Sequence, residues 1–315
     1  MDKTEASYTH VPVLRDACIE ALALRPDGVY VDATLGGAGH SAEIARTLAE
    51  GRLIGIDRDE YALARAGERL APWSGRVTLV HSDFRRMADC LAQAGVTGVD
   101  GILFDLGCSS FQLDDPGRGF SYMHDAPLDM RMDRTCGMTA HELVNTADAQ
   151  ELRRILFTYG EERYAPRIAE AIVRARASRP VETTGELARI IADAMPAAAR
   201  REKQHPAKRS FQALRIAVND ELTAIDEALR AAIDALNPGG RLAVISFHSL
   251  EDRIAKQVMA EAAQGCTCPP EFPVCVCGRH PRVRLVTRKP ILPTAQECEE
   301  NPRARSAKLR VAEKL

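Results

Sequence analysis

Short apolar runs and amphipathic helical stretches alternate through the first hundred residues of the chain. Four runs have the length of strands, at 29–32, 53–57, 77–81 and 102–105. Helical patterns follow the first three runs, at 41–48, 60–70 and 85–94. Alternation of this kind predicts right-handed βαβ units and therefore an α/β fold with a parallel sheet.

The alternation stops after Asp105, and the next pattern of a buried strand comes only at 242–247. An ordinary crossover needs far fewer residues, and the chain between shows helical patterns at 149–159, 163–176 and 184–194. We therefore predict a helical domain inserted into the sheet. The predicted parts are a first sheet part at 1–110, a substrate-recognising insertion at 111–205, and a second sheet part at 206–315 with a basic C-terminal segment.

The insertion is expected to return to the sheet through one long helix. Apolar residues recur at spacings of three and four from Phe211 to Leu236, which is a single apolar stripe on a helix. The sequence NPGG at 237–240 would end this helix before the strand at 242–247.

The composition is that of an ordinary soluble protein, with 45% hydrophobic and 27% charged residues. No apolar run approaches the roughly 20 residues of a membrane helix, and the polar N-terminus does not resemble a signal peptide. We expect a cytoplasmic protein with no membrane partner and with its 9 cysteines largely reduced. The net charge is −2, yet Lys and Arg concentrate at 200–215, 279–289 and 301–315. These segments are either solvated faces or one phosphate-binding surface.

A glycine loop, DATLGGAGH from Asp32 to His40, follows the first strand. Glycines there let the backbone approach a ligand, and the next helix offers free N–H groups. The loop departs from the dinucleotide pattern G-x-G-x-x-G because no glycine follows Gly39 at the third site. Taken alone, the loop fits a structural turn as well as a ligand site.

The next three strands also end in residues suited to a nucleoside. Asp57 closes the second strand, Phe84 follows the third and Asp105 ends the fourth. Open α/β sheets bind ligands at this carboxyl edge, where an acid can accept hydrogen bonds from ribose hydroxyls. A nicotinamide dinucleotide and S-adenosylmethionine both fit this outline. Asp32 would repel a pyrophosphate, whereas Asp32 and Asp105 suit a sulfonium and an ammonium, so we predict S-adenosylmethionine and methyl transfer.

Longer blocks of the sequence resemble the bacterial small-subunit rRNA cytosine-N4 methyltransferase family over about residues 9–313. They are HVPVL at 10–14, DATLGGAGHS at 32–41, GIDRD at 55–59, DLGCSS at 105–110, RGFSYMHDAPLDMRMD at 118–133, YGEERYA at 159–165, SFHSLEDR at 246–253 and NPRARSAKLR at 301–310. The resemblance implies a Rossmann-like class I methyltransferase sheet with a helical insertion. It also implies S-adenosylmethionine as cofactor and, as substrate, the N4 amine of a cytidine in the decoding region of 16S rRNA within the small ribosomal subunit, with no role for DNA. The cofactor contacts that it implies are Ala38, Gly39, His40, Asp57, Phe84, Asp105 and Gln112.

The catalytic candidates are Asp105, His248 and Asp252. The N4 lone pair is delocalised into the pyrimidine ring, so an acceptor for the N4 hydrogens would make it a better nucleophile. Asp105 suits that role, although contact with the cofactor alone is an alternative. His248 and Asp252 would support it, or SLED at 249–252 is only the capping box of the next helix. Many N4-amine methyltransferases carry a Pro-Pro-aromatic loop after the fourth strand, and this chain has DLGCSS there instead.

Three further segments contain candidate interaction residues, and two of them allow two interpretations. Asp129, Arg131 and Asp133 form a salt-bridged hinge or contact RNA. Residues 205–211 place basic and aromatic side chains where they suit phosphate contacts and stacking, and four basic residues of the tail would extend that surface, Arg303, Arg305, Lys308 and Arg310. The cluster Cys266, Cys268, Cys275 and Cys277 is a zinc site or a metal-free loop, and we assign no metal to the predicted site.

Other functions remain compatible with these patterns. The same fold could methylate a protein or a small molecule, and a non-catalytic ribosome-binding factor could retain the cofactor pocket. A nicotinamide oxidoreductase is a further alternative.

Overall fold

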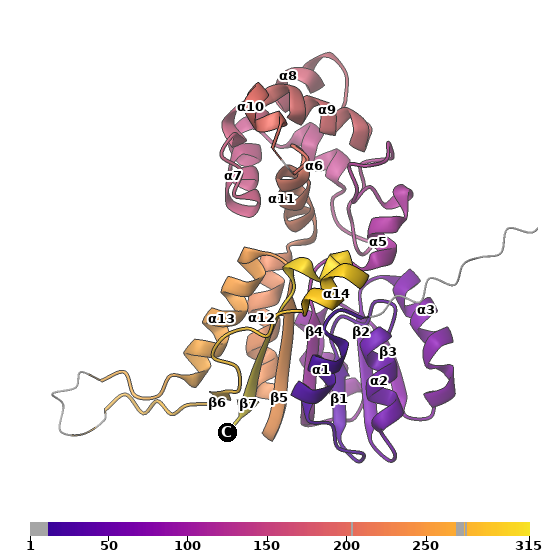
Figure 1. Ribbon diagram of the computed structural model, residues 1–315, viewed down its shortest axis with the longest axis vertical. Helices are drawn as coiled ribbons and strands as arrows, with labels where there is room; N and C mark the ends of the chain where they lie inside the picture. The colour runs from indigo at the N-terminus through magenta and orange to yellow at the C-terminus, as the bar shows by residue number, and fades with distance from the viewer. Residues whose placement is uncertain (1–11, 203, 269–273, 275) are drawn as a thin grey trace, which may run out of the picture. The chain divides into compact units, whose positions relative to one another are not determined.

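The structure is a computed structural model that describes residues 12–202, 204–268, 274 and 276–315. The first two residues of the HVPVL block and Cys275 lie outside this range. Contacts divide the chain into two compact units. Figure 1 colours the chain by residue number, so the sheet unit has the colours of both ends of the bar and the helical unit those of its middle. The sheet unit comprises the chain up to Gly107 and from Ala224 onward, and the helical unit is Cys108–Thr223. The predicted α/β fold with an inserted helical part is confirmed.

The sheet unit is built on seven strands in the order β3-β2-β1-β4-β5-β7-β6. Their bounds are β1 Val29–Asp32, β2 Arg52–Asp57, β3 Val77–His81, β4 Val99–Asp105, β5 Leu236–Ser246, β6 Val283–Leu285 and β7 Lys308–Lys314. The first five strands are parallel, while β7 runs antiparallel to both β5 and β6. Strands β6 and β7 were not among the elements predicted from the sequence.

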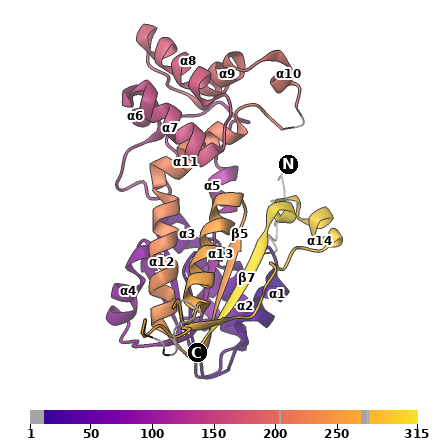
Figure 2. The ribbon, with the colours of Figure 1, turned by 90° about the vertical axis from the view of Figure 1, so that its left-hand side faces the viewer.

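Helices cover both faces of this sheet. Their bounds are α1 Arg15–Leu22, α2 Gly39–Thr47, α3 Glu60–Leu70, α4 Met87–Gln93, α12 Glu221–Ala235, α13 Ser249–Ala263 and α14 Ala295–Glu300, with short 3₁₀ turns at Ala71–Trp73, Phe84–Arg86 and Pro302–Ser306. Figure 2 shows α1 and α2 on one face and α12 and α13 on the other. The strands read as apolar runs because both of their faces are buried.

The long helix predicted from Phe211 to Leu236 is wrong in one respect, because it is two helices. Helix α11 spans Lys208–Asn219, and Asp220 then adopts a left-handed conformation with φ of 47° before α12 begins. Buried residues of α11 belong to the core of the helical unit. A break of one residue is invisible to periodicity when the apolar spacing stays at three or four on either side.

The helical unit has a core of its own. Its helices are α5 Ser110–Asp114, α6 Ala140–Thr146, α7 Ala149–Gly160, α8 Ala165–Ser178, α9 Thr184–Ala194, α10 Ala197–Arg200 and α11, with a 3₁₀ turn at Pro116–Arg118. Side chains of α7, α8, α9 and α11 supply most of the buried cluster. At Gly160 a Cβ atom would lie 2.7 Å from the carbonyl oxygen of Arg209, so this glycine allows α7 and α11 to pack closely.

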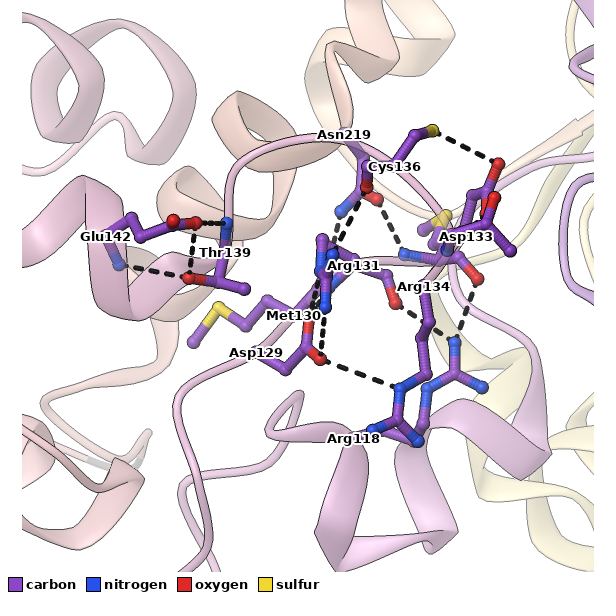
Figure 3. A network of polar contacts seen from close by, with 12 residues as sticks. Arg118, Asp129, Met130, Arg131, Asp133, Arg134, Cys136, Thr139, Glu142 and Asn219 are labelled. Atoms are coloured by element: carbon purple, nitrogen blue, oxygen red, sulfur yellow. Dashed lines mark hydrogen bonds and ion pairs between the residues drawn. The ribbon is translucent and has the colours of Figure 1, made fainter.

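The LDMRMD segment is held by a polar network that Figure 3 shows. Asp129 accepts hydrogen bonds from Arg131 Nε at 2.7 Å and Nη2 at 3.1 Å. Arg118 Nη2 donates to the carbonyl oxygens of Arg131 and Met132, at 3.0 and 2.9 Å. Asp133 accepts from the hydroxyl of Thr135 at 2.6 Å. These contacts favour the salt-bridged interpretation of the segment.

Asn219 connects this segment to α11. Its Oδ1 accepts from the Met132 amide at 2.8 Å, and its Nδ2 donates to the carbonyl oxygens of Met130 and Arg215, at 2.7 and 2.9 Å. The Asn219 side chain is buried, so water could not take over these hydrogen bonds if the side chain were removed.

We expect Asn219→Ala to lower the free energy of unfolding by about 3 kcal/mol, since it leaves buried donors and acceptors without partners. Urea denaturation followed by circular dichroism measures the effect. Glu170→Ala is the control, because that side chain is 65% exposed on α8 and should change stability by less than about 0.5 kcal/mol. Equal stability of the two variants would show that the Asn219 bridge is dispensable.

Candidate functional site

Three acids lie at the carboxyl edge of the sheet, at the ends of β1, β2 and β4. The parallel register pairs Asp32 with Gly55 on β2 and with Leu103 on β4. Asp57 and Asp105 end these two neighbouring strands. The expectation that these acids share one edge is therefore met by the strand order.

Asp32 is only 2% exposed. It accepts hydrogen bonds from Ser41 Oγ at 2.7 Å and from the Thr34 amide at 3.2 Å. Burial raises the pKa of Asp32 to about 6, against the effect of these two hydrogen bonds. Among the described residues, no ion pair neutralises this carboxyl group, so the site favours an incoming cation.

Asp57 fixes the shape of the glycine loop. Its Oδ2 accepts from the Gly36 amide at 2.8 Å, and its Oδ1 accepts from the Asp59 amide at 2.9 Å. Gly36 has φ of 48°, a conformation that suits glycine. Burial raises the pKa of Asp57. Each carboxylate oxygen can accept a second hydrogen bond, which suits the hydroxyls of a ribose.

Asp105 has an unsatisfied oxygen. Its amide donates to Thr34 Oγ1 at 2.6 Å, which anchors the end of β4 to the glycine loop. Its Oδ1 is buried and has no hydrogen-bond partner among the residues that the structure describes. Burial, followed by the charges of Asp32 and Glu251, raises the pKa of Asp105 to about 8. The side chain is still 27% exposed, so a ligand can reach this carboxyl group, one oxygen of which lacks a hydrogen-bond partner.

His40 lies beside Asp105, with 3.6 Å between His40 Nδ1 and Asp105 Oδ2. Its other nitrogen, Nε2, is 3.0 Å from the carbonyl oxygen of Val13 and must donate there, because a carbonyl only accepts. In a neutral ring this leaves Nδ1 as an acceptor that faces the carboxyl group. A protonated Asp105 and a neutral His40 are therefore complementary, because the first offers a proton donor and the second an acceptor.

The start of α2 leaves room for a ligand backbone contact. Its N-cap residue, Ala38, has φ of 56° and no side chain that could cap the helix. A Cβ atom on Gly39 would lie 2.4 Å from Pro12 Cγ, so only glycine fits there. Ala38 and Gly39 thus form the start of α2 together with His40, which lies beside Asp105.

Phe84 opens the 3₁₀ turn after β3. Its ring packs edge-to-face on Phe104 of β4, with centroids 5.7 Å apart and planes at 76°. Asp83 caps this turn by accepting from the Arg85 amide at 2.9 Å. The aromatic ring is thereby held by the strand that carries Asp105.

His248 is the N-cap of α13, so the predicted capping box begins one residue earlier than Ser249. Its Nδ1 accepts from the Glu251 amide at 3.4 Å. Glu251 Oε2 accepts in return from the amides of Phe247 and His248, at 2.7 and 3.2 Å. Glu251 was not predicted as a site residue. Its position three residues after the N-cap is nevertheless the one from which a carboxylate reaches back to the N-cap amide in a capping box. It is fully buried, and its charge contributes to the raised pKa of Asp105.

The carboxylate of Asp252 is paired with two cations of β7. It accepts from Arg310 Nε at 2.6 Å and from Lys308 Nζ at 3.0 Å, and the hydrogen bonds and charges of these two cations lower its pKa despite its partial burial. Arg310 is 9% exposed. Because Lys308 and Arg310 both pair with this acid, they are less available to extend a phosphate-binding surface, and that extension stays a prediction.

Gln112 lies in the helical unit. Its Oε1 accepts from the Ser109 amide at 3.1 Å, and Ser109 Oγ accepts from the Gln112 amide at 3.3 Å, which closes a capping box on α5. Within its own unit the side chain thus has a structural role.

The helical unit also contains a pocket of about 400 Å³. Its lining residues are Glu162, Arg163, Tyr164, Met195, Ala199, Glu202, Gln204, His205, Pro206 and Arg209. His205 stacks on Tyr122 with centroids 4.5 Å apart, and the Arg163 guanidinium lies 4.8 Å from the centroid of the Tyr164 ring. The start of the basic, aromatic segment at 205–211 therefore lines a cavity with aromatic and basic side chains, in which Glu162 and Glu202 balance the two arginines and Glu202 pairs with Arg163 at 2.6 Å.

No helix in the described part of the chain is long and apolar enough to cross a membrane.

Comparisons with known proteins agree over nearly the whole length. The model of a family described as the MraW methylase family matches residues 7–315. A Brevibacillus brevis protein named ribosomal RNA small subunit methyltransferase H is 57% identical over 313 residues, 99% of this chain and 100% of that one. Proteins of the same name from Heliobacterium modesticaldum and Paenibacillus sp. (strain JDR-2) are each 58% identical, over 98% of this chain and 99% and 100% of theirs.

Proposed function

The chain belongs to the MraW methylase family, and from this membership we propose that it methylates small-subunit ribosomal RNA with S-adenosylmethionine as methyl donor. The names of its relatives support the RNA substrate. The resemblance of the sequence blocks supports a finer proposal, which is the exocyclic N4 amine of a cytidine in the decoding region of 16S rRNA.

The observation that carries the cofactor proposal is a pair of acids, Asp32 and Asp105, which have no arginine or lysine partner among the described residues. S-adenosylmethionine supplies an electrophilic methyl group on a sulfonium, and it also carries an ammonium. Two carboxyl groups with raised pKa values, one of them with an unsatisfied oxygen, fit these cations. Asp57 would hold the ribose hydroxyls and Phe84 the adenine face.

Backbone groups complete the proposed cofactor site. Ala38, Gly39 and His40 form the uncapped start of α2, where main-chain donors face a ligand. The resemblance of the sequence blocks also implies Gln112 as a cofactor contact.

Asp105 is the proposed catalytic group. As a carboxylate, Asp105 accepts a hydrogen bond from the N4 amine and then the proton that this amine loses when the methyl group moves from the sulfonium sulfur to N4. His40 Nδ1 lies on the other oxygen and can share that proton, because the Val13 carbonyl fixes its tautomer. We propose an indirect role for His248 and Asp252. His248 accepts a hydrogen bond from the Glu251 amide, and Asp252 connects α13 to β7 through Arg310.

Methyl transfer from labelled cofactor to purified 30S particles tests the proposal directly. We expect label in 16S rRNA and N4-methylcytidine in its nuclease digest, identified by mass spectrometry. Label in protein would favour a protein methyltransferase of the same fold, and no label with intact cofactor binding would favour a ribosome-binding factor.

The pocket of the helical unit is the proposed RNA contact. We expect Arg163→Ala with Arg209→Ala to weaken binding to 30S particles and to reduce the dependence of log affinity on log salt by about one for each phosphate that the protein no longer neutralises. Filter binding across salt concentrations measures both effects. Arg174→Ala on α8, where the side chain is 70% exposed, is the matched control. An unchanged salt dependence in the double variant would exclude this surface.

A further inference from the structure

Three cysteine side chains converge in the segment between α13 and β6. The sulfur atoms of Cys266, Cys268 and Cys277 all lie within 4.8 Å of one another. The Cys266 and Cys277 sulfur atoms are 3.7 Å apart. The sequence patterns alone leave a zinc site and a metal-free loop open, with the metal-free loop as the default, and the convergence of the three sulfurs favours the zinc site.

The sulfur spacing has the size expected around one metal ion. Zinc binds thiolates at about 2.3 Å, which places two sulfurs of a tetrahedral site about 3.8 Å apart. A disulfide needs about 2.05 Å. The separation of 3.7 Å between Cys266 and Cys277 matches the edge of the tetrahedron.

Backbone amides are aimed at each of the three sulfurs. The Thr267 amide donates to Cys277 Sγ at 3.5 Å, the Cys268 amide to Cys266 Sγ at 3.4 Å, and the Val276 amide to Cys268 Sγ at 3.3 Å. Amide donors stabilise the negative charge of thiolates and orient metal ligands. Three such contacts in one short segment prepare the sulfurs for the thiolate state.

The described residues of this segment have little regular structure or buried surface of their own. It is closed at its base, where the Arg282 amide donates to the Ala262 carbonyl at 2.7 Å. Among its described residues there is no helix or strand, and Val274 and Val276 are 70% and 74% exposed. A segment without secondary structure or a buried core of its own needs a covalent or metal crosslink to keep one conformation.

We propose that Cys266, Cys268 and Cys277 bind a structural zinc ion as thiolates. Thiolates select soft or borderline ions, and zinc suits a structural site because it has no redox chemistry. A tetrahedral zinc site takes one further ligand beyond these three thiolates. This site is independent of methyl transfer, since none of its cysteines belongs to the proposed cofactor or catalytic groups.

Metal analysis of the full-length protein tests the inference. We expect about one zinc per chain after purification under reducing conditions without added metal, retained after passage over a chelating resin. Cys266→Ser with Cys277→Ser should reduce the zinc content at least tenfold, while Cys136→Ser with Cys298→Ser, which removes two cysteines outside the cluster, should leave it unchanged.

A second readout guards against misfolding of the double variant. Cobalt taken up by the apo protein should give the intense sulfur-to-cobalt absorption of a tetrahedral thiolate site, and zinc should abolish it. Far-ultraviolet circular dichroism should show that the double variant keeps its helices. Metal-free native protein, zinc lost to the resin, or equal zinc in the cluster variant and its control would each overturn the proposal.

Discussion

Asp105→Asn should lower the turnover of 30S methylation by at least about 100-fold at saturating S-adenosylmethionine. The amide has nearly the same shape, but it cannot take the N4 proton or carry the negative charge that localises the amine lone pair. Single-turnover methyl transfer to 30S particles measures the loss, because it separates chemistry from cofactor binding.

The free variant should be at least as stable as the parent chain. In the parent, burial and the charges of Asp32 and Glu251 disfavour ionisation of Asp105. An uncharged amide removes this repulsion, so thermal unfolding at neutral pH separates lost chemistry from lost folding.

Asp100→Asn is the matched control, since Asp100 lies near the opposite end of the same strand. There it accepts from the Val29 amide and from Asn237 Nδ2, at 2.9 and 3.1 Å. Its turnover should stay within about twofold of the parent chain. If Asp105→Asn also keeps full turnover at saturating cofactor, Asp105 is only a cofactor contact and another group accepts the proton.

The affinity for S-adenosylmethionine should rise about tenfold between pH 6 and 7 and about fivefold between pH 7 and 8, a total of about 50-fold from Asp105 alone. In the free protein the pKa of Asp105 is about 8, so most molecules must lose a proton before this carboxyl group can pair with the cationic cofactor. Asp32, with a pKa of about 6, adds to the slope near the lower limit.

Calorimetric titration in buffers of different ionisation enthalpy measures both the affinity and the protons released. Asp105→Asn should flatten the slope between pH 7 and 8 and leave the contribution of Asp32 near pH 6. A constant dissociation constant from pH 6 to 8 would mean that neither acid pairs with the cofactor.

The stability of the free protein should change in the opposite direction over the same window. Both acids have raised pKa values when folded, relative to about 3.8 when unfolded. Their contribution is therefore fully present below about pH 4 and is lost as the pH rises through 6 and then 8. Thermal unfolding with and without cofactor should show opposite pH trends.

The first four strands and the polar edge could be predicted because each signal there is local. An apolar run that ends in an acid identifies β1, β2 and β4, and parallel pairing brings Asp32, Asp57 and Asp105 to one edge. The α/β sheet with a helical insertion follows from these elements and from the length of the interruption.

The parts that escaped prediction depend on pairing between distant residues. Strand β7 includes Lys308, Arg310 and Glu313, so its charges obscure its apolar positions. The burial of Arg310 within a strand is explained only by its ion pair with Asp252, 58 residues earlier in the sequence. In the same way, Glu251 looks like part of an ordinary capping box until burial places its charge near Asp105.

The strand order also constrains how this chain folds during synthesis. Strand β5 pairs with β7 from Arg241 to Ser246, and the partners Ser246 and Lys308 are 62 positions apart in the sequence. At about 5–20 residues per second, a ribosome needs about 3–12 s to make the residues between them. During that time the apolar strand β5 has an open edge, which is a site where nascent chains aggregate or recruit chaperones.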